Sequence, residues 1–320
     1  MKSKWANQQP LAARLCGLVN FRNEIRKPPS REGGFCVSAT YDDAANLMLP
    51  KISLGDEPKD GSDADELERV SVASDLFRQH GALFLENAVD RKLVAKLAKA
   101  FAKKYQSLSQ KELKDRDAMV GDRRYMVTVD IKKPFNDPGL YANPRWMPIL
   151  ESLLSPHLRI VSYGVVVALP GADDQSIHLD HPPLFESAAN GSQKVDLPPW
   201  AVTLVVPLVE IDRQIGPTAI WPGTHLAADR IERLQTLMES PGYSDAQKPE
   251  TKLGDAYMMD YRVIHGGLAN DSDRPRPILY LVYGRPWFRD GFNFSSQPAV
   301  QISKKQRKKV PSRWQGLFRG

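Results

Sequence analysis

The stretch AVTLVVPLVEIDRQIGPTAIWPGTH, residues 201–225, contains two short apolar runs. The runs cover residues 201–209 and 218–221, and Gly216-Pro217 and Pro222-Gly223 lie on the two sides of the second run. Short apolar runs that are bounded by glycine and proline are typical of β-strands joined by turns. We therefore expect two strands within this stretch.

Runs of the same kind occur on both sides of this stretch. They cover residues 82–85, 125–131, 160–169, 256–261 and 278–283, and turn formers separate most of them. Many short strands with such turns predict a mainly β sandwich or barrel. Helices are expected to flank it. One follows a capping Asp90 and has apolar residues at helical spacing as far as Tyr105, and two more are expected at 148–154 and 229–238.

The composition is that of a globular protein. Hydrophobic residues make up 42% of the 320 residues, which is enough for a sizeable core. No run of about 18 apolar residues is present, so no membrane-spanning helix is expected, and the polar first ten residues do not resemble a secretory signal. The two cysteines, Cys16 and Cys36, are too few for a disulfide framework or a four-thiolate zinc site. We therefore expect a cytoplasmic protein.

The net charge of +6 is concentrated at the C-terminal end. Residues 301–320 contain seven lysines and arginines and no acid, which leaves the rest of the chain near neutral. This distribution argues against a broad nucleic-acid-binding surface. We divide the chain into an irregular N-terminal extension (1–70), a folded domain (71–290) and a basic C-terminal tail (291–320). The tail is expected to be a solvated end, and docking through Trp314, Leu317 and Phe318 is the alternative.

A candidate metal site is formed by His178-Leu179-Asp180 and a distant histidine. On a strand, residues i and i+2 project to the same face, so the imidazole of His178 and the carboxylate of Asp180 can converge on one ion. His265 is the best third ligand, because it follows a predicted strand and Gly266-Gly267 leaves room for bound molecules. Two imidazoles and one carboxylate leave adjacent coordination positions open, as a non-haem Fe(II) oxygenase requires. A surface hydrogen bond between His178 and Asp180 is the alternative reading.

Four landmarks in order resemble the phytanoyl-CoA dioxygenase family of Fe(II)/2-oxoglutarate oxygenases. They are residues 80–87 (HGALFLEN), His178-Leu179-Asp180, residues 216–225 (GPTAIWPGTH), and Gly254-Asp255 with His265-Gly266-Gly267, Asn270 and Arg274-Pro275-Arg276. The resemblance runs from about residue 76 to about residue 287. It implies a double-stranded β-helix, which is a jelly-roll or cupin-like barrel with helices packed outside.

The resemblance also implies the cofactors and their ligands. His178, Asp180 and His265 would hold Fe(II), and 2-oxoglutarate would chelate the iron as the cosubstrate that is consumed with O₂. Arg276 matches the family position that grips the distal carboxylate of 2-oxoglutarate, as a guanidinium fork suits a carboxylate. Arg274 is the alternative candidate for this role. Pro275 and Pro277 flank Arg276 and lack a backbone N–H, so strand pairing there is expected to be incomplete and the burial of Arg276 stays open.

The chain departs from the family at Gly267, where a hydroxyl residue often assists the cosubstrate carboxylate. We expect Thr218 or Tyr163 to supply that donor instead. Substrate-pocket candidates, chosen from their place in the chain, are Arg124, Tyr125, Tyr163 and Phe185.

The expected function is oxidation of an unactivated C–H bond of a small molecule, for example one of secondary metabolism, with release of succinate and CO₂. A carboxylate at Asp180 favours hydroxylation over halogenation, and desaturation and cyclisation stay open. Two alternatives are a non-catalytic metal-binding or scaffold homologue and a cupin-like Zn or Ni hydrolase or isomerase.

Overall fold

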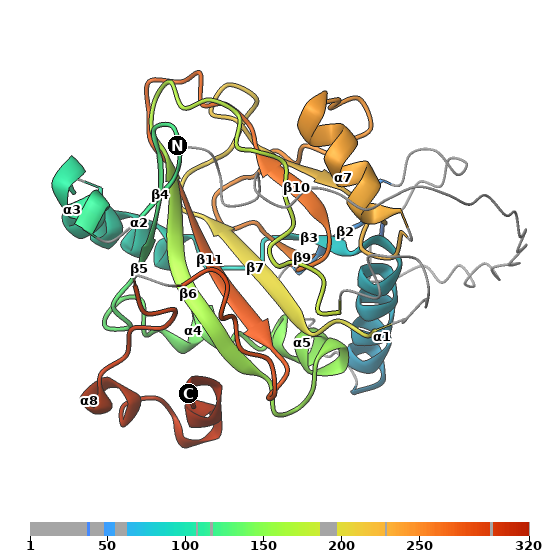
Figure 1. The fold of residues 1–320 in the computed structure, drawn as a ribbon. Coiled ribbons are helices and arrows are strands. Elements are labelled where there is room, and N and C mark those ends of the chain that lie inside the picture. The colour runs from blue at the N-terminus through green and yellow to red at the C-terminus, as the bar shows by residue number, and fades with distance from the viewer. Residues whose placement is uncertain are drawn as a thin grey trace, which may run out of the picture.

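A computed structural model describes residues 37–38, 48–54, 63–106, 108–115, 118–185, 197–227, 229–294 and 297–319 (Figure 1). Cys16 and Cys36 lie outside these residues. The strands are β1 (Val37–Ser38), β2 (Lys51–Ser53), β3 (Ala82–Glu86), β4 (Met119–Gly121), β5 (Arg124–Thr128), β6 (Arg159–Ala168), β7 (Ala201–Pro207), β8 (Thr218–Trp221), β9 (Ala256–Asp260), β10 (Ile264–Gly267) and β11 (Arg276–Gly284). The helices are α1 (Asp63–His80), α2 (Arg91–Tyr105), α3 (Gln110–Asp115), α4 (Pro138–Tyr141), α5 (Met147–Leu153), α7 (Arg230–Glu239), α8 (Lys304–Arg307) and the 3-10 helix η2 (Ser312–Phe318).

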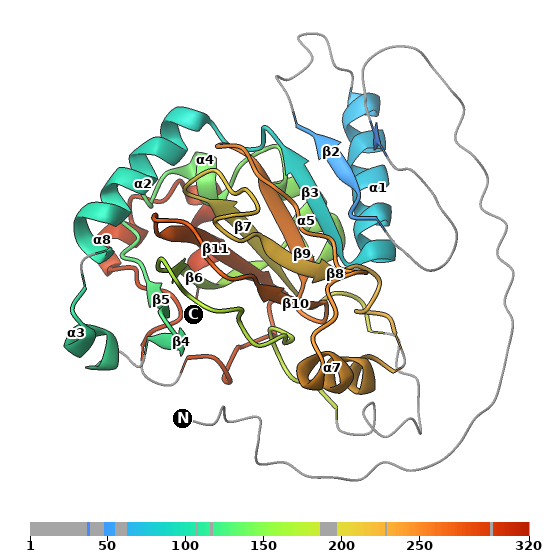
Figure 2. The ribbon, with the colours of Figure 1, turned by 90° about the horizontal axis from the view of Figure 1, so that it is seen from above.

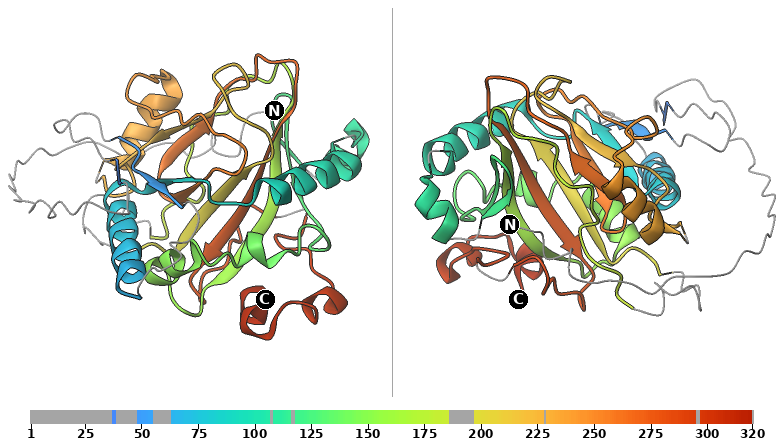
Figure 3. Two further views of the ribbon diagram at one scale, coloured as in Figure 1. Left: turned by 180° about the vertical axis from the view of Figure 1, so that it is seen from behind. Right: turned by 45° about the horizontal axis from the view of Figure 1, so that its top comes forward.

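The major sheet has nine strands in the order β1-β2-β3-β9-β7-β11-β6-β5-β4. Its outer face is apolar and packs against α1, α2, α4 and α5, which lie on this side when the molecule is seen from behind (Figure 3). Every second residue of β6 faces the helices: Tyr163, Val165 and Val167 belong to the helix-covered core. The residues between them face the other side, because successive side chains of a strand alternate.

A smaller sheet, β10-β8, lies against the inner face of the major sheet. His178 pairs with His265 in an isolated antiparallel bridge, which extends the small sheet by one more segment. Helix α7 covers the outside of this sheet, where Leu234 and Leu237 pack with Trp221 and Ile264 (Figures 1 and 2). Two sheets that face each other, with helices outside, make the predicted double-stranded β-helix.

The strand and helix predictions are largely confirmed. All seven runs that were predicted to be strands contain one, and the bounds of 218–221 agree in full. Helix α2 begins after Asp90, whose side chain accepts a hydrogen bond from the backbone N–H of Leu93 at 2.8 Å. The strand β10, which carries His265, was not predicted as an element, because four residues with two glycines do not form a recognisable apolar run.

The segment 1–70 was predicted to be an irregular extension that could be partly packed on the body, and its described residues include regular elements. Strand β2 pairs in parallel with β3, and α1 begins at Asp63. The polar first half of α1 hides its periodicity, since the buried residues Ala73, Leu76 and Phe77 come only in its second half.

The expectation of a solvated C-terminal tail is wrong. Leu317 and Phe318 are buried, and the ring of Phe318 meets that of Tyr141 edge to face at 5.1 Å between centroids. The backbone of Gln301 bonds to that of Ile131 at 2.9 Å. Apolar contacts at the end of the segment therefore outweigh its basic charge, and Figure 1 shows it folded back beneath the sheet.

None of the helices in the described part of the chain combines the length and the apolar content needed to cross a lipid bilayer.

Candidate metal and cosubstrate site

Three side chains meet at the edge where the small sheet approaches the major sheet. His178, Asp180 and His265 each offer a ligand atom, and these atoms all lie within 4.8 Å of one another. The two imidazole rings are 4.4 Å apart at their centroids, and Nε2 of His265 lies 3.5 Å from Oδ1 of Asp180. The bridge between the backbones of His178 and His265 produces this proximity across 87 residues of chain.

Both imidazoles are oriented by backbone carbonyls. Nδ1 of His178 lies 2.7 Å from the carbonyl of Ser176, and Nδ1 of His265 lies 3.0 Å from that of Val263. A carbonyl only accepts, so each neutral ring carries its proton on Nδ1 and turns the lone pair of Nε2 away from it. This arrangement is typical of histidines that ligate a metal.

The carboxylate of Asp180 is also held in place. Its Oδ2 accepts a hydrogen bond from the hydroxyl of Thr203 at 2.7 Å, and its backbone carbonyl accepts one from Asn293 at 2.8 Å. Burial opposes the charged form, but His265, His178 and Thr203 outweigh it and hold the pKa of Asp180 below its usual value.

The two histidines differ in their electrostatics. Burial, His265 and, more weakly, Arg124 lower the pKa of His178 to about 4. Burial also acts against the charged form of His265, but Asp180 raises the pKa of that imidazole. At neutral pH Asp180 is therefore ionised and His178 is neutral, and a divalent cation bound by both imidazoles would displace the proton that Asp180 stabilises on His265.

The donor set fits a single transition-metal ion. Two imidazole nitrogens and one carboxylate oxygen suit divalent iron, and they cover one side of the ion only. In the described part of the chain this is the one group of three or more potential ligands close enough to share an ion.

Arg276 lies on the inner face of the major sheet, at the start of β11. It is 1% exposed and opposes Ala168 of β6, so the flanking Pro275 and Pro277 do not keep it from the interior. Arg274, the rival, is exposed. Burial and the nearby Arg124 lower the pKa of Arg276 to about 10. The buried guanidinium therefore needs an anion, and its Nε has no hydrogen-bond partner.

Thr218 lies across the barrel from this arginine, in contact with a residue that was not predicted. The Thr218 hydroxyl is 2.8 Å from the hydroxyl of Tyr257. Tyr257 in turn is close enough to Arg276 to favour the charged form of the guanidinium. Tyr257 stands in a strand whose five residues are all buried, so no alternation of polarity revealed which face it occupies.

Tyr163 does not reach the site, and its predicted role is wrong. Its side chain belongs to the helix-covered core, where its hydroxyl donates to the carbonyl of Phe135 at 2.9 Å. Tyr125 faces the same way and donates to the carbonyl of Tyr105. Phe185 is half exposed. Of the four pocket candidates, only Arg124 is buried on the inner face.

Aromatic side chains gather around His181, the residue that follows Asp180. His181 follows Asp180 directly, and its ring contacts those of Tyr261, Phe288 and Phe292 at 5.4–6.4 Å between centroids. Tyr280, on the inner face of β11, has a buried hydroxyl without a hydrogen-bond partner. Burial, Asp180 and Asp290 raise the pKa of Tyr280, so the hydroxyl keeps its proton and can donate it.

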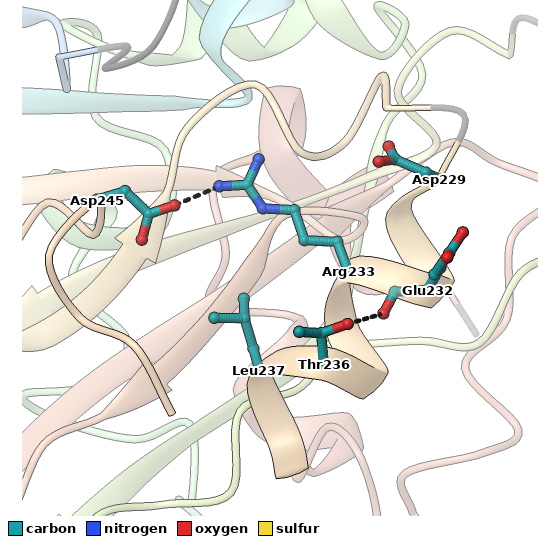
Figure 4. A pocket seen from close by; sticks show the side chains of 6 residues that line it. All are labelled: Asp229, Glu232, Arg233, Thr236, Leu237 and Asp245. Atoms are coloured by element: carbon teal, nitrogen blue, oxygen red, sulfur yellow. Dashed lines mark hydrogen bonds and ion pairs between the residues drawn. The ribbon is translucent and has the colours of Figure 1, made fainter. Parts of the chain in front are cut away.

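A separate hollow lies outside the barrel beside α7 (Figure 4). It is lined by Asp229, Glu232, Arg233, Thr236, Leu237 and Asp245. Arg233 and Asp245 pair across it at 2.5 Å, and Asp245 also accepts from the indole of Trp221. Because the hollow lies on the outside of the small sheet, we assign it no role in the site.

Comparisons with known proteins show what this chain is similar to. The family model described as phytanoyl-CoA dioxygenase matches residues 77–278. A similar curated protein is the dioxygenase peniF of Penicillium patulum, 23% identical over 228 residues that cover 65% of this chain and 70% of the relative.

The fold is shared with a solved structure. HygX from Streptomyces hygroscopicus, with nickel and 2-oxoglutarate bound, superposes with a TM-score of 0.50 at 16% identity, over 68% of this chain and 88% of that one. EctD from S. alaskensis, with 2-oxoglutarate and 5-hydroxyectoine, gives a TM-score of 0.46 at 20% identity, over 73% and 87%.

Proposed function

Because the chain belongs to the phytanoyl-CoA dioxygenase family, and is therefore an Fe(II)- and 2-oxoglutarate-dependent oxygenase, we propose that His178, Asp180 and His265 hold the iron. The observation that carries this assignment is the convergence of the three ligand atoms within 4.8 Å. The bound iron would supply the oxidative chemistry, in which O₂ and 2-oxoglutarate are consumed and succinate and CO₂ are released.

The protein supports the ligands in three ways. Backbone carbonyls fix the tautomers of His178 and His265, so that both Nε2 lone pairs face the ion. Thr203 holds one oxygen of Asp180 and leaves the other free to ligate. All protein ligands lie on one side, which leaves the opposite side for the cosubstrate, O₂ and the substrate.

We further propose that Arg276 binds the distal carboxylate of 2-oxoglutarate. The guanidinium is buried, lies on the inner face and has an unpartnered Nε. Thr218 and Tyr257, joined by a hydrogen bond, offer a hydroxyl donor beside it. A planar fork and a hydroxyl would together satisfy both oxygens of a carboxylate.

The substrate is proposed to be a small molecule with an apolar or aromatic body. The rings of His181, Tyr261, Phe288 and Phe292 form a rigid apolar wall directly after Asp180, and Phe292 is 46% exposed. The Tyr280 hydroxyl would donate to an acceptor on the substrate. Hydroxylation of an unactivated C–H bond held against this wall is the expected outcome.

The test is incubation of the protein with Fe(II), 2-oxoglutarate, O₂ and a panel of aromatic and polycyclic metabolites. Succinate should form, and mass spectrometry should detect one product that is heavier than its substrate by one oxygen atom. Conversion of a substrate under anaerobic conditions with Zn(II) or Ni(II) would contradict the proposal and favour a hydrolase or isomerase.

A further inference from the structure

A second buried arginine lies beside Arg276. Strands β5 and β11 flank β6, and Arg124 and Arg276 both oppose Ala168 in the register. Residues at one register position project to the same face of a sheet, so the two side chains enter the barrel interior from neighbouring strands. Each is 1% exposed.

The two guanidinium groups meet over Gly267. A Cβ atom on Gly267 would lie 2.8 Å from Nη2 of Arg276 and 2.9 Å from Nη1 of Arg124, closer than side-chain carbons normally come. The amide oxygen of Gln175 faces the same point at 3.2 Å. The space that a side chain at position 267 would fill is therefore occupied by two cationic groups.

The contacts of these arginines leave their charge uncompensated. Nη2 of Arg124 donates to the carbonyls of Asp173 and Leu268 at 2.9 and 3.2 Å, and Nη1 of Arg276 donates to that of Leu268 at 3.3 Å. Nη1 of Arg124 and Nε of Arg276 have no partner. Among the residues that the structure describes, no carboxylate forms an ion pair with either group.

The nearest acid does not alter this conclusion. Asp174 acts on Arg124 only at longer range, and its oxygens accept hydrogen bonds from Tyr243 and the backbone of Ala269. Two like charges that are buried together without an anion are unfavourable, and a bound anion relieves both the repulsion and the lost solvation.

We infer that Arg124 is a second donor to the distal carboxylate of 2-oxoglutarate, and that position 267 is glycine because the two guanidiniums need its space. This inference rests on the proposed function, since it takes 2-oxoglutarate as the anion. A carboxylate has two oxygens with about four lone pairs, enough for a donor from each arginine. With both arginines as donors, the affinity for an oxo acid would depend strongly on its distal carboxylate.

The direct test measures binding rather than turnover. The full chain is loaded with Mn(II) and titrated by calorimetry with 2-oxoglutarate and with 2-oxopentanoate, which has the same length but no distal carboxylate. Arg124→Met should weaken 2-oxoglutarate binding about 10- to 100-fold, as expected for loss of a charged hydrogen bond, and leave 2-oxopentanoate binding unchanged.

The other outcomes contradict the inference in distinct ways. Equal weakening of both oxo acids would place Arg124 at the end that they share. Unchanged binding of both, with a raised KM for the organic substrate, would assign Arg124 to an acid on the substrate. Arg276→Met is the reference: if it too leaves 2-oxoglutarate binding unchanged, the proposed cosubstrate site itself is wrong. If only Arg276→Met weakens binding, the inference about Arg124 alone fails.

A second pair of variants tests the role of the glycine and does not depend on Arg124→Met folding well. Gly267→Ser should displace both guanidiniums and weaken 2-oxoglutarate binding. Arg124→Ala/Gly267→Ser removes one of the two close contacts, gives Arg276 room to move aside and adds a hydroxyl, so it should bind 2-oxoglutarate more tightly than Gly267→Ser alone. If the double variant binds 2-oxoglutarate more weakly than both Gly267→Ser and Arg124→Ala, the inference is overturned. Mn(II) affinity and thermal unfolding serve as controls for folding.

Discussion

The outer and inner faces of the major sheet contain the same kinds of polar residue but use them differently. On the outer face, the hydroxyls of Tyr125, Tyr163 and Tyr283 each donate to a backbone carbonyl at 2.8–3.2 Å. On the inner face, the Tyr280 hydroxyl, Nη1 of Arg124 and Nε of Arg276 have no partner. Both faces are equally buried, so burial alone does not distinguish them.

The difference separates groups that stabilise the fold from groups that await a ligand. A buried donor without a partner costs free energy, and a ligand bound at the inner face would relieve that cost. The unpartnered inner groups lie on the face to which the metal triad belongs, because Thr203 of that face holds Asp180. We therefore expect inner-face substitutions to change ligand binding and outer-face substitutions to change stability.

The largest effect is expected for Asp180→Ala. Loss of the only anionic ligand should weaken Fe(II) or Mn(II) binding about 1,000-fold, equivalent to about 4 kcal/mol, and abolish succinate formation. Metal titration of the purified variant checks this result. Full turnover by the variant would show that Asp180 does not ligate the metal.

Arg276→Met should raise the Kd for 2-oxoglutarate about 100-fold, since it removes one partner of a buried charged contact. Metal affinity should stay unchanged, because the arginine does not contact the triad. Arg274→Met is the matched control, since that arginine is exposed and should not affect 2-oxoglutarate binding. If Arg274→Met weakened 2-oxoglutarate binding and Arg276→Met did not, Arg274 would be the residue that binds the distal carboxylate.

Thr203→Val should weaken metal binding about 10-fold, since a hydrogen bond that orients a ligand is lost while the shape of the side chain is kept. Metal titration measures the affinity, and the Kd for 2-oxopentanoate and the thermal stability of the variant are measured in parallel. A loss of stability with unchanged metal affinity would make Thr203 a purely structural residue.

Tyr280→Phe should raise the KM for the organic substrate about 5-fold and leave the Kd for 2-oxoglutarate unchanged, since one neutral hydrogen bond to the substrate is lost. The free energy of unfolding should not fall, because the hydroxyl has no partner in the protein. Lower stability with unchanged KM would contradict its assignment to the substrate.

Tyr163→Phe makes the same chemical change on the opposite face. It should lower the free energy of unfolding by about 1 kcal/mol, because the carbonyl of Phe135 loses its buried donor. Binding of metal and cosubstrate should stay the same. Denaturant unfolding and calorimetry together check both statements, and weaker 2-oxoglutarate binding would place this tyrosine back in the site.

The sequence predicted the parts of the site that local spacing controls. His178 and Asp180 are two residues apart in the chain, so their convergence could be predicted from the spacing, and the glycines beside His265 indicated room for bound molecules. Strand 160–169 was predicted, but it is apolar on both faces. The side occupied by Tyr163 could therefore not be assigned, because the alternation that reveals it is absent.

Long-range pairing explains most of what was missed. The shared register of Arg124 and Arg276 depends on how β5 and β11 both pair with β6, and no local pattern in either strand contains that information. Tyr257 reaches Thr218 only because two sheets face each other. At the C-terminal end, the basic composition favoured a solvated tail over docking through Leu317 and Phe318, whose burial anchors the segment.

The most direct test of the account is an anaerobic titration of the Fe(II)-loaded protein with 2-oxoglutarate, followed by visible absorption. We expect a charge-transfer band that saturates at one equivalent, requires His265, and is weakened by Arg276→Met but not by Tyr163→Phe. Absence of the band in the wild-type protein, or its persistence in His265→Ala, would contradict the claim that the inner face binds iron and 2-oxoglutarate together.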